Sequence, residues 1–139
     1  MIDNITFSMI KPDAIQNGHV GEIITMIERG GFRIKALKLT QISLESAGQF
    51  YAIHKERHFY EQLCRYMSSN PVIAMILEKD NAVADFRGLI GATDPAEAAP
   101  GTIRKRFAKS IEANAIHGSD ADKTALVEAK FFFPKIDLS

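Results

Sequence analysis

The sequence has a single cysteine, Cys64, so no disulfide can form within the chain. Seventeen basic and seventeen acidic side chains leave no excess charge of either sign. This balance argues against a surface that binds a polyanion such as nucleic acid. No stretch approaches the roughly 18 apolar residues that a membrane span needs, and the first residues do not resemble a secretion signal. These absences predict a soluble, cytoplasmic protein without membrane attachment.

Glycine-rich nucleotide-binding loops are also missing, because the chain contains neither a P-loop nor the GxGxxG pattern of a dinucleotide fold. Any phosphate group would therefore have to be held by side chains. Repeats, low-complexity stretches and linkers are absent as well. Of the 139 residues, 46% are hydrophobic and 24% are charged, which is typical of a globular protein. We expect residues 1–139 to form a single domain.

Hydrophobic periodicity predicts strands that alternate with helices. Apolar residues at 20, 23, 24 and 27 have the spacing of an amphipathic helix, which Gly30 and Gly31 would end. Residues 71–77 are nearly all apolar, as in a strand that is buried on both faces. The other expected elements are strands at 6–10, at 32–40 with a bulge, and at 114–117, and helices after Ser43, around 59–67, 81–90, 103–108 and 122–130.

This alternation implies an α/β layered domain in which helices cover one sheet. Periodicity alone leaves open whether the sheet is ferredoxin-like (βαββαβ) or a small doubly wound one. In either fold, functional residues gather at strand ends and on the joining loops. Lys11, His117 and the loop at 91–102 fall at such places.

Residues 114–120 (NAIHGSD) form a short polar segment that fits neither core periodicity. The imidazole of His117 is uncharged yet nucleophilic near neutral pH, and it can form a covalent intermediate with a phosphoryl group. Gly118 would let a reactant approach the ring, and Ser119 and Asp120 could bond local backbone N–H groups. The alternative interpretation is an ordinary loop histidine before a helix that Asp120 or Asp122 caps.

Phosphoryl transfer needs a nucleophile in line with the phosphorus and cations over its charged oxygens. Lys11, Arg87 and Arg104 are candidate cations, and Thr93 is a candidate hydroxyl donor. Arginine suits the task because its planar fork can bond two phosphate oxygens at once. Arg104 is the most informative of the three, because it follows a Pro-Gly-Thr turn at a predicted helix start, where backbone N–H groups also point outward.

The NxxHGSD pattern at 114–120 resembles the active-site signature of the nucleoside diphosphate kinases. The resemblance runs from Thr6 to Phe133, nearly the whole chain, and implies a four-stranded antiparallel, ferredoxin-like sheet covered by helices. Four further segments match that family in order and spacing: residues 11–13 (KPD), 51–57 (YAIHKER), 91–95 (GATDP) and 98–104 (AAPGTIR).

The resemblance also implies an activity, namely transfer of the γ-phosphate from a nucleoside triphosphate to a nucleoside diphosphate. The route would be ping-pong, through a phosphate on Nδ1 of His117. Mg²⁺ would be held mainly by the nucleotide phosphates rather than by a protein cage. Any base, and both ribo- and deoxyribonucleotides, would be accepted, and the protein would be a homo-oligomer, a tetramer or a hexamer.

Matching this sequence to the family position by position assigns roles to further residues. Ser119 and Glu128 match the pair that supports and orients His117, and Lys11 with Asn114 matches the residues that bond the ribose 3′-hydroxyl. The positions that match phosphate contacts are Lys11, Tyr51, Arg87, Thr93 and Arg104.

The positions that match base contacts include departures from the family pattern. Phe59 matches the aromatic residue on which the base stacks, and Ile111 stands where the family usually has valine. His58 replaces a proline that would rigidify the turn before Phe59, so we expect this corner to be less preorganised. The sequence given ends six residues after Phe133, without the longer tail of many relatives, which leaves the type of oligomer open.

Two other functions remain as alternatives. One is a regulatory nucleotide- or nucleic-acid-binding protein of the same fold that has lost catalysis, and the other is a phosphohistidine relay that passes phosphate to a protein. The first is disfavoured because a degenerate binder has no need of an accessible nucleophile, and this chain keeps the full set Lys11, Tyr51, Asn114, His117 and Glu128.

Overall fold

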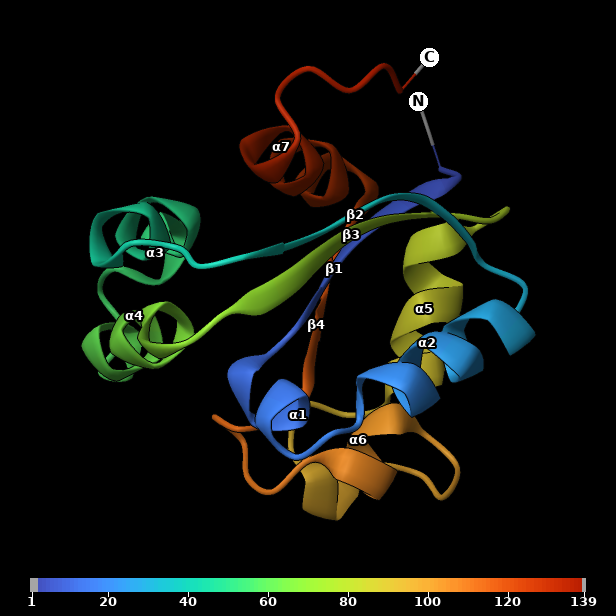
Figure 1. Cartoon of the computed structure of the whole chain (residues 1–139), viewed down its shortest axis with the longest axis horizontal. Coiled ribbons are helices and arrows are strands. Elements are labelled where there is room, and N and C mark those ends of the chain that lie inside the picture. Colours follow the sequence, from blue (N-terminus) through green and yellow to red (C-terminus); the bar gives the residue numbers. More distant parts are fainter. Residues whose placement is uncertain (1–2, 139) are drawn as a thin grey trace.

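A four-stranded antiparallel sheet forms the centre of the computed structural model, which describes residues 3–138 (Figure 1). The strand order is β2-β3-β1-β4, as in a ferredoxin-like sheet, with two helices inserted between β2 and β3. This confirms the sheet that the family resemblance implies. The strands are β1 (Ile5–Ile10), β2 (Arg33–Thr40), β3 (Val72–Glu78) and β4 (Ile116–Gly118).

Helices cover both faces of the sheet, and each face has its own hydrophobic cluster. One cluster packs the sheet against α2, α5 and α6, and the other packs it against α3, α4 and α7 (Figure 1). The helices are α1 (Pro12–Gln16), α2 (Val20–Arg29), α3 (Leu44–Phe50), α4 (Tyr60–Ser69), α5 (Ala82–Ile90), α6 (Ile103–Phe107) and α7 (Asp122–Phe132), with short 3₁₀ turns at Ala52–His54 and Pro95–Glu97.

The elements with strong local signals form where the sequence predicts them. Strand β3 is buried on both faces, since Met75 belongs to one cluster and Ile76 to the other. Ser43 caps α3 through a hydrogen bond from the Ser46 N–H to its hydroxyl. The bulge in the 32–40 strand is present as a register shift between Ile34 and Ala36.

Three helix starts differ from the sequence prediction. Helix α1, which the sequence did not predict, begins at Pro12, whose fixed φ suits the first turn of a helix. Phe59 precedes α4 instead of lying on its apolar stripe. Asn81 precedes α5 with a positive φ and without a side-chain cap. Helix α7, in contrast, begins at Asp122 as predicted, with Ala121 before it.

The last strand is also displaced, because β4 covers 116–118 rather than 114–117. It pairs with β1 so that Met9 lies opposite His117. The backbone N–H of Ser119 continues this pairing by donating to the Phe7 carbonyl at 3.2 Å. Sheet pairing therefore sets the place of His117. Among residues 3–138, no helix is both long and apolar enough to cross a membrane.

Candidate active site

His117 is half-buried at the edge of the sheet and is held through one of its two ring nitrogens. Its Nε2 lies 3.0 Å from Oε1 of Glu128, which α7 carries. The Ser119 hydroxyl donates to the same carboxylate oxygen at 2.6 Å. Because Nε2 makes this contact, an attack by the imidazole on a substrate would have to come from Nδ1. The structure thus brings together the histidine and the two residues expected to orient it.

Ser119 acts over a longer range than the sequence interpretation suggested. Its hydroxyl accepts a hydrogen bond from the backbone N–H of Phe7 at 3.2 Å, so it joins β1 to Glu128 rather than fixing a local turn. The expectation of local backbone bonds was wrong for this residue. The sequence lacks a signal for the contact, because 112 residues separate the two partners.

Gly118 also has a different role from the expected one. A Cβ at this position would lie 2.9 Å from Cδ1 of Ile90 and 3.0 Å from Cδ2 of Phe86, both on α5. The glycine therefore allows α5 to pack closely on β4, whereas the sequence suggested that it admits a reactant. On the other face, the rings of Phe7 and Phe50 lie 6.1 and 5.7 Å from the His117 ring.

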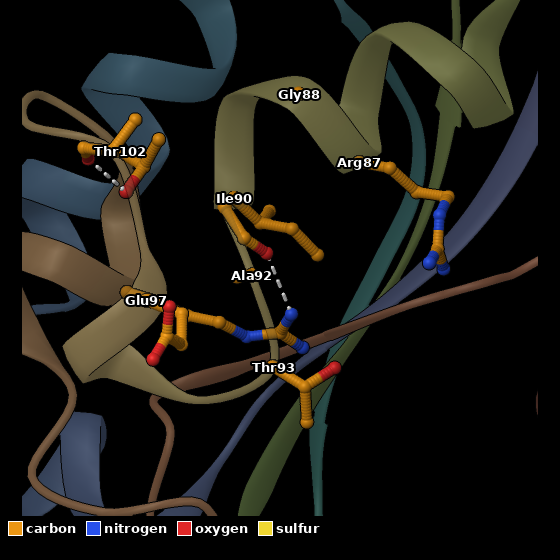
Figure 2. A pocket seen from close by; sticks show the side chains of 10 residues that line it. Arg87, Gly88, Ile90, Ala92, Thr93, Glu97 and Thr102 are labelled. Atoms are coloured by element: carbon orange, nitrogen blue, oxygen red, sulfur yellow. Dashed lines mark hydrogen bonds between the residues drawn. The ribbon is translucent and has the colours of Figure 1, made fainter.

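A pocket of about 480 Å³ lies where α5 ends and the 91–104 segment begins (Figure 2). Three predicted phosphate-contacting residues, Arg87, Thr93 and Arg104, line it. Figure 2 shows Arg87 on α5 and Thr93 on the chain that follows this helix. The pocket is thus built by two adjoining segments that the sequence had marked separately.

The predicted cations lie close enough to affect one another. Burial, together with the positive charge of Arg104, lowers the pKa of Lys11 to about 8. Burial, together with the charge of Arg87, lowers the pKa of Arg104 to about 10. Such a cluster of positive charges is destabilised by mutual repulsion and desolvation. An anion bound among them would relieve both effects.

Arg104 is anchored by backbone carbonyl groups. Its guanidinium donates to the Gly91 carbonyl at 2.9 Å and to the Ile116 carbonyl at 2.8 Å. Within the described chain its buried Nε has no partner. The residue therefore joins the pocket loop to the strand that carries His117. The start of α6 is capped by Thr102, whose hydroxyl accepts from the Lys105 N–H, so at least this N–H group is not free for an anion.

Among residues 3–138, the Tyr51 hydroxyl and Oδ1 of Asn114 are buried without a partner, as are Nε of Arg104 and the hydroxyls of Thr6 and Ser8 on β1. The Asn114 amide donates to the Thr93 carbonyl at 3.1 Å, which links it to the pocket loop. Burial and the Glu128 carboxylate raise the pKa of Tyr51, so its hydroxyl stays protonated and can donate. Because buried polar groups are rarely unpaired, the Tyr51 hydroxyl and Asn114 Oδ1 are candidates for contacts with a bound ligand.

Phe59 and Ile111 are not among the residues that line the pocket. The Phe59 ring packs against those of His54 and His58, at 5.7 and 5.6 Å. The Ile111 side chain is 59% exposed. Both are accessible apolar surfaces, and their predicted contact with a base stays a prediction.

The described residues contain no group of three or more histidine, cysteine, aspartate or glutamate side chains that could hold a metal ion. Glu97 is the one carboxylate among the residues that line the pocket.

Comparisons with known proteins all point to one family. The family model described as nucleoside diphosphate kinase matches residues 4–138. The nucleoside diphosphate kinase of Flavobacterium psychrophilum is 56% identical over 133 residues, 96% of each chain. That of Chlorobium luteolum is 56% identical over 128 residues, 92% of this chain and 91% of the relative.

Solved structures are similar over almost the whole chain. The nucleoside diphosphate kinase of Aquifex aeolicus superimposes with a TM-score of 0.92 at 42% identity, covering 94% of both chains. That of Halobacterium salinarum, solved in complex with CDP, has a TM-score of 0.92 at 37% identity and covers 99% of this chain and 94% of its own.

Proposed function

Because this chain belongs to the nucleoside diphosphate kinase family, we propose that it transfers the γ-phosphate by a ping-pong route through His117. The observation that carries this route is the contact between Glu128 and Nε2. A carboxylate that accepts the Nε2 proton fixes the imidazole tautomer in which Nδ1 holds a lone pair. The Ser119 hydroxyl bonds the same carboxylate and holds it in place.

In the first half-reaction, Nδ1 of His117 attacks the γ-phosphorus of a nucleoside triphosphate. The N–P bond forms as the bond from this phosphorus to the β,γ-bridging oxygen breaks, and the nucleoside diphosphate leaves. The ring then carries a positive charge, which Glu128 balances across the Nε2 proton. In the second half, a terminal oxygen of another diphosphate attacks the same phosphorus, and His117 leaves as neutral imidazole.

Lys11, Arg87 and Arg104 would bind the phosphate oxygens, since their charges are close enough to lower the pKa values of two of them. Thr93 and Tyr51 would donate hydroxyl hydrogen bonds. Mg²⁺ fits this site as an ion carried on the phosphates, where it would neutralise their charge, because magnesium commonly keeps several waters and uses few protein ligands.

The nucleoside would be held mainly by surface contact and by the sugar. Phe59 would stack on the base and Ile111 would touch its edge, and stacking tolerates every base because each has a π-face. Asn114 and Lys11 would bond the 3′-hydroxyl, and neither residue would bond the 2′-hydroxyl. Purine and pyrimidine nucleotides, with ribose or deoxyribose, would therefore all be substrates.

The substitution His117→Ala tests the nucleophile. The control variant is His19→Ala, which removes an imidazole outside the proposed site. The protein is mixed with triphosphate labelled on the γ-phosphate, and bound label is followed before and after a diphosphate is added. We expect the wild type and His19→Ala to take up acid-labile label and to release it to the diphosphate. His117→Ala should take up none.

Retained transfer in His117→Ala, or an acid-stable phosphoprotein, would overturn the mechanism. Label that forms on His117 but is not discharged by any diphosphate would favour a relay that passes phosphate to a protein. Nucleotide binding without labelling of the wild type would favour a regulatory binder.

A further inference from the structure

Asp13 lies where three segments of the proposed site meet. It is 8% exposed, on α1, two residues after Lys11. Its Oδ2 accepts a hydrogen bond from the backbone N–H of Ala115 at 3.1 Å, and its Oδ1 accepts one from the hydroxyl of Tyr66 on α4. The Tyr66 oxygen in turn accepts the backbone N–H of Asp13 at 3.0 Å. One residue thus bridges the chain before β4 and helix α4.

The bond to Ala115 holds a backbone turn that favours glycine. Ala115 has a φ of +74°, a conformation that residues with a side chain rarely adopt. The backbone N–H of Ala115 donates to the Asp13 carboxylate, and the carbonyl of Ala115 accepts a hydrogen bond from the backbone N–H of Lys11 at 2.9 Å. Ala115 follows Asn114 and precedes the strand that carries His117. Asp13 therefore fixes the sugar-binding asparagine relative to the phosphate-binding lysine.

The bond to Tyr66 reaches the base side of the site. Helix α4 begins directly after Phe59, the proposed base platform. Figure 1 shows α3 and α4 lying together at one end of the molecule. Another α4 hydroxyl, that of Tyr60, donates to the Gly48 carbonyl at 2.9 Å and so joins α4 only to α3. Tyr66, in contrast, joins this helix pair to the sugar and phosphate residues.

We propose that Tyr66 and Asp13 are a positioning pair that sets the Phe59 platform at a fixed distance from Lys11 and Asn114. The inference rests on the proposed function. A nucleotide spans these groups as one semi-rigid ligand, so its base can stack without displacing its phosphates only if the spacing is right. Neither residue of the pair needs to touch the nucleotide.

The test compares ATP with ribose 5′-triphosphate, which has the same sugar and phosphates but no base. The ATP advantage is the single-turnover rate of His117 phosphorylation with ATP divided by the rate with ribose 5′-triphosphate. This ratio measures what base stacking contributes. Tyr66→Phe keeps the ring and removes only the hydroxyl, and we expect it to lower this advantage by roughly 3- to 10-fold, which is part of the roughly 5- to 150-fold that base stacking commonly supplies. Tyr60→Phe, which loses a hydroxyl from the same helix, should keep the wild-type ratio.

Adding Asp13→Asn to Tyr66→Phe should lower the ATP advantage little further, because the contact between the two residues is already lost and the amide oxygen can still accept the Ala115 N–H. If Tyr66→Phe does not fold, Tyr66→Met takes its place, since it also removes the hydroxyl and leaves Asp13 bonded to Ala115. An unchanged ratio in a folded variant, or an equal fall in Tyr60→Phe, would overturn the proposal. If the wild type forms no phosphohistidine, the proposed function fails, and the ratio of dissociation constants for the two triphosphates then tests the pair by the same criteria.

Discussion

At the scale of single residues, Lys11 gives the proposed site a pH dependence. Its pKa is lowered to about 8, first by burial and then by Arg104. A lysine is charged below its pKa, so the free enzyme loses this cation as pH rises through 8. We expect kcat/KM for a nucleoside triphosphate to fall above this pH, by about tenfold per unit at most, because this ratio reports ionisations of the free enzyme.

The measurement is kcat/KM and kcat between pH 6 and 9, below the lowered pKa of Arg104, for the wild type and Lys11→Arg. The value of kcat should stay level to higher pH, because bound phosphate raises the pKa of Lys11. Lys11→Arg keeps its charge throughout this range, so its alkaline fall should be absent even if its rate is lower. An identical fall in both proteins would assign the ionisation to another group.

Asn114 gives a second prediction, which concerns the sugar. Its Oδ1 is buried without a partner in the described chain, which suits a bond from a ribose hydroxyl. A nucleotide that lacks the 3′-hydroxyl would leave this atom and Lys11 unpaired. We expect its single-turnover rate to fall by about 10²–10⁴-fold, since each buried unpaired group costs roughly 1–3 kcal/mol. The comparison uses ribo-, 2′-deoxy- and 2′,3′-dideoxynucleoside triphosphates.

The ribo- and 2′-deoxy compounds should react at nearly equal rates, which makes the 2′-deoxy compound the control for a change at the sugar. Equal rates for all three would remove Asn114 and Lys11 from this role. A collapse at the 2′-deoxy step would mean that the site reads the other hydroxyl.

At the scale of elements, the packing of α5 on β4 depends on the absence of a side chain at Gly118. A Cβ there would meet Ile90 and Phe86 at 2.9 and 3.0 Å. We expect Gly118→Ala to lower the free energy of unfolding by about 1–3 kcal/mol, because a well-packed interface must shift to admit the methyl group. Urea unfolding at constant pH measures the change.

The matched control is Gly88→Ala, within α5 itself. A Cβ at Gly88 would meet nothing within 4 Å. This substitution should raise stability by roughly 0.5–1 kcal/mol, since alanine is the better helix former. If Gly118→Ala were equally stabilising, the close contact between α5 and β4 would not constrain the position of His117.

At the scale of the whole molecule, one edge of the sheet has the features of an interface. Strand β2 is an edge strand, and its Leu37 and Leu39 are 46% and 65% exposed. Edge strands with exposed apolar side chains tend to pair with other chains. We expect a homo-oligomer, a tetramer or a hexamer, in which β2 makes a subunit contact.

Sedimentation equilibrium should therefore give a mass four or six times the 15.4 kDa of the chain. Leu39→Lys should lower that mass, because it places a charge in the contact. Ile53→Lys, at a residue that is 85% exposed outside β2, should leave the mass unchanged. A monomeric wild type at micromolar concentration would exclude the oligomer.

The sequence by itself determined the elements whose signals are local. The apolar run of β3, the helical spacing of α2 and the Ser43 cap each depend on neighbours in the chain, and each formed as predicted. The start of α4, which lacks a side-chain cap, was misplaced, because Phe59 precedes this helix instead of belonging to it. The antiparallel sheet followed from family resemblance, because periodicity reports which face is buried and not which strand lies beside it.

Only the tertiary structure decided what each site residue contacts. The motif marked His117, but its Nε2 partner on α7, the link from Ser119 to Phe7 and the packing of Gly118 on α5 join segments far apart in the chain. Asp13 lay inside one of the matched segments without a predicted role, because its partners are 53 and 102 residues away. A sequence pattern reports the average environment of a residue, whereas a hydrogen bond needs two atoms within about 3 Å, and only the packed fold sets that distance.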